Sequence, residues 1–216
     1  MYHEYMRRRI LLFCALLPVA PLLVAQTSPQ AATKAPSIDT GAITNGIYKN
    51  ELFAFSYRIP VSWVDRTDEM QEASTDPKKS TVLLGVFERP PQASGPTVNS
   101  AVVIAAETAS SYPGLKNAAQ YFGPISQVSE SKGLKPVNEP YEFPVDGKAI
   151  VRRDFVKQSG PGMHQTTLAL LSRGYVLSFT FIGSSDDEVQ QLIEALKFGV
   201  SRHSSAGSGK TPKPTS

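Results

Sequence analysis

Two histidines beyond residue 25 are the first side chains to consider as catalytic or metal-binding groups. His164 follows the stretch SGPGM at the start of a strand-like run, and His203 borders the C-terminal tail. A histidine serves as a base or a ligand only beside an orienting group and a nucleophile or metal. These two histidines have no spacing typical of a metal site. We therefore expect His164 to be an ordinary residue at the edge of a strand.

The stretch VRRDF offers a possible anion clamp. In a strand it places Arg152 and Asp154 on one face and Arg153 on the other. Arg152 and Asp154 could clamp an anion or pair across strands. Because sheets use cross-strand charge pairs routinely, we expect these two side chains to be solvated or paired across strands.

Four acidic residues follow the only tryptophan. Asp65, Asp68, Glu69 and Glu72 could supply oxygen ligands for calcium. They lack the Asp-x-Asp-x-Asp-Gly spacing of an EF-hand loop. We expect a solvated acidic segment.

Sequence motifs of familiar enzymes are absent. GSGKT (207–211) resembles the end of a P-loop, but Ser204 stands where a glycine is needed, and Pro212 and Pro214 prevent the helix that must follow. No nucleophile elbow, His-Glu-x-x-His or dinucleotide fingerprint occurs. Cys14 is the only cysteine, which excludes an intrachain disulfide. We predict no catalytic residue, no cofactor, no cofactor-binding residue and no metal ligand. A site assembled from distant residues would leave no such motif.

The N-terminus is typical of an export signal. Three arginines (7–9) precede an apolar run of 16 residues, Ile10–Ala25, that contains Pro18 and Pro21. A membrane-spanning helix needs about 20 apolar residues. We therefore predict that residues 1–25 are a signal peptide and that the mature chain is extracytoplasmic, either periplasmic or secreted. The alternative is an inner-membrane anchor formed by an uncleaved signal.

The remaining chain divides into three segments. Residues 26–46 contain few large apolar side chains, so we expect a disordered linker. Residues 47–203 form one candidate domain, and the Ser-, Gly- and Pro-rich residues 204–216 form a disordered tail. Without residues 1–25, the net charge falls from +3 to +1. No basic stripe remains, so we predict no nucleic-acid partner.

Strand patterns dominate the domain. Aromatic and small residues alternate over Phe53–Ile59, as in a half-buried strand. The continuous apolar runs Thr81–Phe87 and Ala101–Ala106 predict strands covered on both faces. Asp146-Gly147 and Arg173-Gly174 separate further runs and suit tight hairpin turns. A meander of antiparallel strands accounts for this pattern.

The tryptophan extends the first of these strand patterns. Val61 and Trp63 continue the odd-numbered apolar face of Phe53–Ile59 beyond Pro60. We therefore expect Trp63 to anchor the core.

Two regions have helical patterns. A capping box at Ser185–Glu188 precedes apolar residues at helical spacing up to Leu196, and Gly199 provides a stop. A second helix is expected from about 115 to 132, interrupted at Gly123-Pro124. Helices that cover a mostly antiparallel sheet define an α+β domain.

Both ends of the domain resemble a known family. YKNELFAFSYRIPVSW (48–63) is similar to the start of PsbP-like domains, and RGYVLSFTFIGSSDDEVQQLIEALKF (173–198) is similar to their close. The resemblance implies an α/β/α sandwich with a central antiparallel sheet. The family includes an extrinsic photosystem II subunit and many exported bacterial proteins without an assigned activity. It brings no shared catalytic residues.

Three functional hypotheses follow. The first is a non-catalytic envelope protein that docks on an envelope or secreted protein partner through a sheet edge, loops or tails. The second is a small-ligand or lipid carrier, with Phe53, Phe55 and Tyr57 lining a cavity between sheet and helix. The third is a hydrolase. A carrier requires a large apolar pocket, whereas an interaction module requires a filled interior and an exposed apolar patch.

Overall fold

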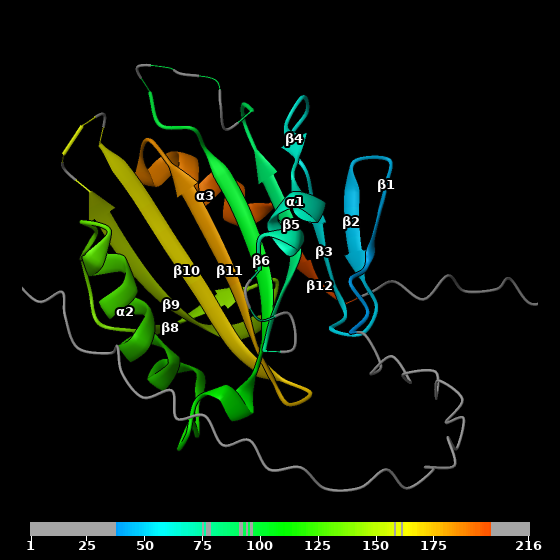
Figure 1. Ribbon diagram of the computed structural model, residues 1–216, viewed down its shortest axis with the longest axis vertical. Coiled ribbons are helices and arrows are strands. Elements are labelled where there is room, and N and C mark those ends of the chain that lie inside the picture. The colour runs from blue at the N-terminus through cyan, green and yellow to red at the C-terminus, as the bar shows by residue number, and fades with distance from the viewer. Residues whose placement is uncertain are drawn as a thin grey trace, which may run out of the picture. The chain divides into compact units, whose positions relative to one another are not determined.

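The computed structural model describes residues 38–199, except for 75, 77, 78, 91, 92, 94, 96, 158 and 161 (Figure 1). The predicted signal peptide (1–25), the tail (204–216) and His203 lie outside the described residues, as do Cys14 and GSGKT. No described helix is long and apolar enough to cross a membrane.

A large antiparallel sheet forms the centre of the domain. Its strands, in spatial order, are β4 (Val64–Asp65), β5 (Ser80–Phe87), β6 (Ala101–Thr108), β11 (Tyr175–Gly183), β10 (Met163–Ser172), β9 (Lys148–Lys157) and β7 (Lys135–Pro136). β8 (Tyr141–Val145) pairs with the first half of β9. All pairings between these strands are antiparallel, as the meander predicted.

A second, smaller sheet packs on the large one. It consists of β1 (Ala42–Thr44), β2 (Ile47–Asn50), β3 (Phe55–Arg58) and β12 (Leu196–Phe198). The helices are α1 (Thr67–Glu72), α2 (Phe122–Ser131) and α3 (Asp186–Glu194), with 3-10 turns η1 (Ala109–Ser111) and η2 (Ala118–Tyr121).

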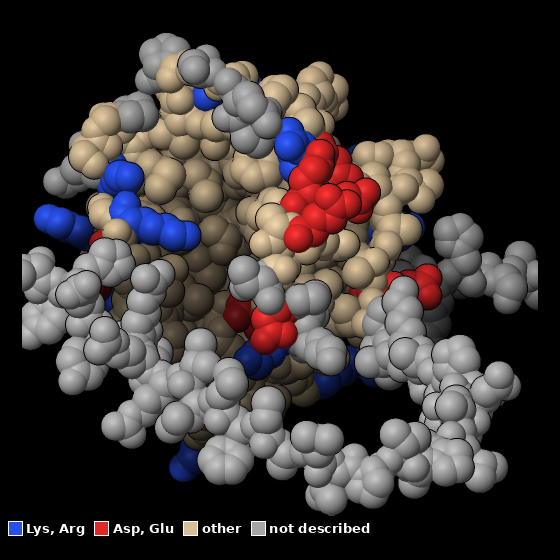
Figure 2. All heavy atoms as spheres, in the orientation of Figure 1, with Lys and Arg blue, Asp and Glu red and all other residues tan. Residues whose placement is uncertain are grey.

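The two faces of the large sheet are covered differently. On one face, its side chains form the main core with the small sheet and with α3. On the opposite face, Ala169 and Val176 pack against Tyr121 and Phe122 of η2 and α2. α1 packs over β5 on this second face, and the middle of the face is hollowed (Figure 2). The predicted α+β sandwich is thus confirmed, with a small sheet as part of one outer layer.

Both predicted hairpin turns are confirmed. Asp146 and Gly147 connect β8 to β9 with φ angles of 51° and 78°. Arg173 and Gly174 connect β10 to β11 with φ angles of 52° and 81°. These left-handed conformations match the strand twist, and they fix the register of β9, β10 and β11.

The expected disordered linker, residues 26–46, is wrong for its last part. Ala42–Thr44 form β1, which pairs with β2 through a turn at Asn45 and Gly46. These two residues have φ angles of 52° and 71°, as Asn-Gly hairpin turns require. β1 is exposed along its length. Main-chain pairing rather than burial holds it, so a criterion based on apolar content missed it.

The C-terminal helix begins where predicted but ends earlier. The Ser185 Oγ accepts a hydrogen bond from the backbone N–H of Glu188, 3.2 Å away. α3 ends at Glu194, not at Gly199, because Leu196–Phe198 pair with β3 as β12. Strand pairing in the small sheet therefore overrides the helical spacing of Leu196.

Proline does not interrupt the second helix. Gly123 and Pro124 lie in the first turn of α2, which the 3-10 turn η2 precedes. A proline in the first turn costs no intrahelical hydrogen bond, because the N–H groups there have no partner in the helix.

Trp63 packs against the main core as expected, although it is only partly buried. The proposed continuation of the apolar face through Val61 is wrong, because Val61 is 93% exposed. Ser62 has a φ of 68°, so the chain turns there and the strand alternation ends.

We expect Trp63→Ala to lower the free energy of unfolding by about 2 kcal/mol, below the 3–5 kcal/mol typical of a fully buried tryptophan. Val61→Ala is the control and should change it by less than about 0.5 kcal/mol. Urea denaturation of both variants measures the difference. Equal, small effects would show that Trp63 is not a core contact.

Candidate functional site

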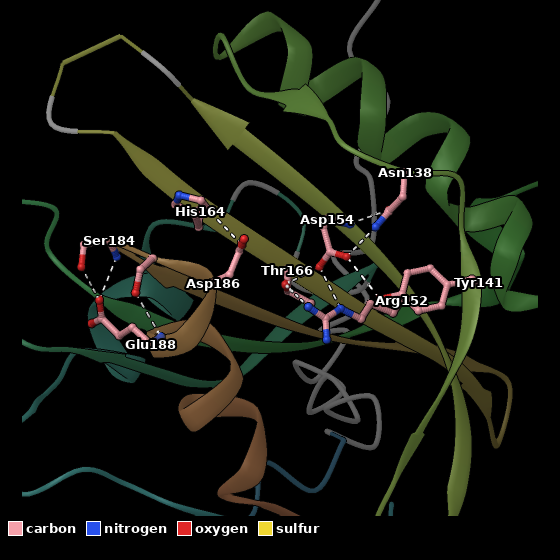
Figure 3. Close-up of polar contacts among 10 residues, drawn as sticks. Asn138, Tyr141, Arg152, Asp154, His164, Thr166, Ser184, Asp186 and Glu188 are labelled. Atoms are coloured by element: carbon pink, nitrogen blue, oxygen red, sulfur yellow. Dashed lines mark hydrogen bonds and ion pairs between the residues drawn. The ribbon is translucent and has the colours of Figure 1, made fainter.

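His164 forms a surface pair with a residue of α3. Its Nδ1 lies 2.7 Å from Oδ1 of Asp186, the first residue of that helix (Figure 3). The Asp186 side chain is 84% exposed. The hairpin register places His164 opposite Gly183, which brings the start of α3 within reach. The pair therefore fastens α3 to the start of β10. Its two residues are 22 positions apart, so no sequence motif indicated the contact.

Arg152 pairs with Asp154 on its own strand, rather than with a solvated or cross-strand charge as expected. Arg152 Nε donates to Asp154 Oδ1 at 2.8 Å, and the two side chains are 12% and 16% exposed. Thr166 also donates to Oδ1, while Asn138 and Tyr141 donate to Oδ2 (Figure 3). With both carboxylate oxygens occupied, Asp154 already acts as the anion that Arg152 binds.

Arg153 points to the opposite face of β9, as predicted. Its Nη1 donates to Ser126 Oγ of α2 at 2.7 Å, and its Nε donates to the carbonyl of Asn138. Glu139 lies 3.7 Å from its Nη2. Arg153 therefore fastens α2 to the large sheet.

Hydrogen bonds keep two carboxylates ionised. Burial alone would raise the pKa of Asp154, but the hydrogen bonds from Thr166, Asn138 and Arg152 outweigh it and lower the pKa below the usual 3.8. Glu188 is similar. Burial raises its pKa, and hydrogen bonds from Ser100 and Ser184 lower it below 4.5. At pH values above their ordinary pKa, both groups therefore stabilise the fold. This contribution disappears as the pH falls through the lowered pKa values.

We expect Asp154→Asn to lower the free energy of unfolding by about 2 kcal/mol at pH 7, because a mostly buried Arg152 loses its counter-charge. The difference from the wild type should shrink as the pH falls through the lowered pKa of Asp154, because the wild-type carboxyl is then protonated as well. Denaturation curves at several pH values test this, with Asp187→Asn on exposed α3 surface as the control. A difference that persists at low pH would mean that the charge is not responsible.

A further cluster was missed by sequence reasoning. Glu107 of β6 accepts hydrogen bonds from the hydroxyls of Tyr112 and Tyr121, the latter at 2.5 Å. Burial, and then the charge of Glu107, raises the pKa of Tyr121. The two rings pack edge to face, with centroids 5.3 Å apart. The cluster holds the connection between β6 and α2 against the sheet, and no motif links these three residues in the sequence.

The cavity expected for a carrier is not present at the predicted aromatic residues. Phe53, Phe55 and Tyr57 are buried in the main core rather than lining a pocket. A surface groove of about 580 Å³ lies elsewhere, lined by Tyr112, Leu115 and neighbouring residues. It opens at the surface on the η1–α2 connection and not between sheet and helix. This observation removes the structural basis of the carrier hypothesis.

The acidic residues after Trp63 lie on β4 and α1. Oδ1 of Asp65 accepts hydrogen bonds from the N–H and hydroxyl of Thr67, and Arg66 pairs with Glu69 at 3.1 Å. Asp68, Glu69 and Glu72 are exposed. Within the described part of the chain, no three His, Cys, Asp or Glu side chains are placed to hold a metal.

The second face of the large sheet is partly exposed over the middle of two central strands, although Ala101, Val176 and Ser178 on the same face are buried. Val103 and Ala105 of β6, and Thr180 and Ile182 of β11, are partly exposed on this face. The expectation that 101–106 is covered on both faces therefore holds for Ala101, whereas Val103 and Ala105 are covered only in part. These four side chains form the floor of the hollow, which we call the open face.

Helices border the open face on both sides. A Cβ atom at Gly85 of β5 would meet the Met70 sulfur of α1, so α1 lies directly over β5. On the other side, α2 and η2 cover β9 and β10, where Thr167 is buried. Between them, two strands span about 10 Å of sheet. The uncovered strip therefore has the width of one secondary-structure element.

The rims of the open face carry opposite charges. Asp68, Glu69 and Glu72 on α1 form the acidic rim. Lys132, which ends α2, and Lys157, which ends β9, form the basic rim. A Cβ atom at Gly133 would lie 3.6 Å from Lys157 Cε, so these two ends are adjacent. Figure 2 shows acidic side chains, with a basic one beside them, on one side of the hollow and basic ones on the other; most of the surface between them is uncharged, with acidic atoms at its lower end.

No protein-family model matches the chain, and no curated protein matches it significantly. Similar solved structures include PsbP from the cyanobacterium Synechocystis sp. PCC 6803, with 16% identity, 70% of this chain and 91% of that chain covered, and a TM-score of 0.46. A protein of unknown function from Pseudomonas aeruginosa has 18% identity and a TM-score of 0.35, and the match covers 74% of this chain and 92% of that chain. LpqN, involved in cell envelope biogenesis of Mycobacterium tuberculosis, has 14% identity and a TM-score of 0.35, and the match covers 68% of this chain and 83% of that chain. Likenesses at these scores assign no function.

Proposed function

We propose that this protein is an exported, non-catalytic interaction module of PsbP-like type that binds a protein partner through the open face. The observation that carries the proposal is the partly exposed apolar strip in the middle of β6 and β11. Soluble domains bury such central strands, and an apolar strip between two helices is typical of a binding surface.

The arrangement of the other polar groups supports a binding role. Arg152 and Asp154 neutralise each other, His164 pairs with Asp186, and Glu107 holds two tyrosines. Each of these groups fastens one element of the fold to another. The interior between the sheets is filled by aromatic side chains. The surface best suited to an external ligand is therefore the open face.

The proposal also includes export, on the grounds of the arginines and apolar run in residues 1–25. The partner would then be another envelope or secreted protein. The proposal uses the face of the large sheet rather than its β7 and β8 edge, where Pro136 and Pro144 disfavour the addition of a strand.

We expect Val103→Arg to abolish partner association while leaving the fold intact. The arginine stem can lie along the strand, but its charge would occupy the floor of the open face. Size-exclusion chromatography of native extracts should show the wild type in a larger complex and the variant as a monomer, with melting temperatures within about 3 °C. Val61→Arg, at a fully exposed position, is the control. A complex of unchanged size in Val103→Arg would refute the proposal.

A further inference from the structure

The open face has room for one helix. An α-helix with its side chains is about 10–12 Å wide, close to the about 10 Å that two strands span. Val103, Ala105 and Ile182 offer apolar contacts on the floor, while α1 and α2 would flank an added helix on either side. The added helix would complete a helical layer over this face of the sheet.

The chemistry of a sheet face favours a helix over an extended peptide. The main-chain groups of β6 and β11 are already paired with neighbouring strands. An extended segment laid on the face would find no main-chain partners for its own N–H and C=O groups. A helix satisfies these groups internally and needs only side-chain contacts.

The charged rims define the flanks of the bound helix. The acidic rim (Asp68, Glu69 and Glu72) attracts basic side chains, and the basic rim (Lys132 and Lys157) attracts acidic ones. Resting on the proposed function, we infer that the open face binds an amphipathic helix of a partner protein, with an apolar stripe on β6 and β11, a basic flank toward α1 and an acidic flank toward α2.

A second copy of this chain fits the surface less well. The only apolar side chain of its α1, Met70, lies over Gly85 of its own sheet, and two hollow faces opposed to each other would meet only at their rims. We therefore assign the surface to a different protein.

Site-specific photocrosslinking in the cells that make the full-length protein tests the inference. The photoreactive p-benzoylphenylalanine replaces Val103 on the floor, Ala73 beside the acidic rim or Ser131 beside the basic rim, so every rim charge is retained. Mass spectrometry of the adducts then identifies the crosslinked residues of the partner. Val61, far more exposed, serves as the control position.

The expected result is that all three positions crosslink to one helix of one partner protein. Lysine or arginine should lie within one turn of the Ala73 adduct, and aspartate or glutamate within one turn of the Ser131 adduct. Glu72→Lys and Lys157→Glu should each reduce the Val103 adduct at least fivefold. Raising the salt concentration in an extract should reduce it as well.

Some outcomes separate the inference from the proposed function. A protein adduct at Val103 that maps to an extended segment, to a second copy of this chain or to a helix with reversed flanks would overturn the inference and leave the interaction module standing. A Val103 adduct whose yield changes with neither Glu72→Lys nor Lys157→Glu would likewise overturn the inference and leave the interaction module standing. The absence of any protein adduct at Val103 would overturn both.

Discussion

The stacking of the small sheet on the large one determines the rest of the structure. Phe55 of β3 meets Phe179 of β11 edge to face, with ring centroids 5.1 Å apart, and Tyr57 lies beside Phe181 at 6.2 Å. All four side chains are buried. Rings in this arrangement contribute large apolar areas and a fixed geometry. These contacts place the main core on one face of the large sheet. The other face is covered only by the short elements α1, η2 and α2.

Those short elements do not cover the second face completely. α1 has six residues and covers β5, whereas η2 and α2 cover β9, β10 and the start of β11. Polar contacts hold them there: Arg153 binds Ser126, and Glu107 binds Tyr112 and Tyr121. The middle of β6 and β11 stays partly exposed between them. The proposed binding surface thus follows from where the core lies.

The sequence predicted the parts of the fold that depend on local chemistry. Turns at Asp146-Gly147 and Arg173-Gly174 and the cap at Ser185 depend on neighbouring residues, and all three were found. β1 was missed although its Asn45-Gly46 turn is local, because its exposed strand lacks large apolar side chains to bury. β12 was missed because pairing with the distant β3 outweighs helical spacing.

The candidate site could not be predicted for a related reason. The run 101–106 is apolar on both faces of its strand, and nothing in it tells which face remains uncovered. That depends on the length and position of α1 and α2, which are distant in sequence. The shared face of Arg152 and Asp154 was predicted, because strand alternation alone places both residues there, but their pairing within one strand was not. The pair of His164 with Asp186 needed the hairpin register as well.

Hydroxyl-radical footprinting of the protein, free and in its native complex, tests the central claim most directly. Oxidation reports the solvent exposure of individual side chains. If the open face is the binding surface, oxidation of Ile182 on the floor and of Met70 on α1 should fall at least threefold in the complex, while that of Val61 stays constant. Unchanged oxidation of Ile182, with protection elsewhere on the molecule, would contradict the account.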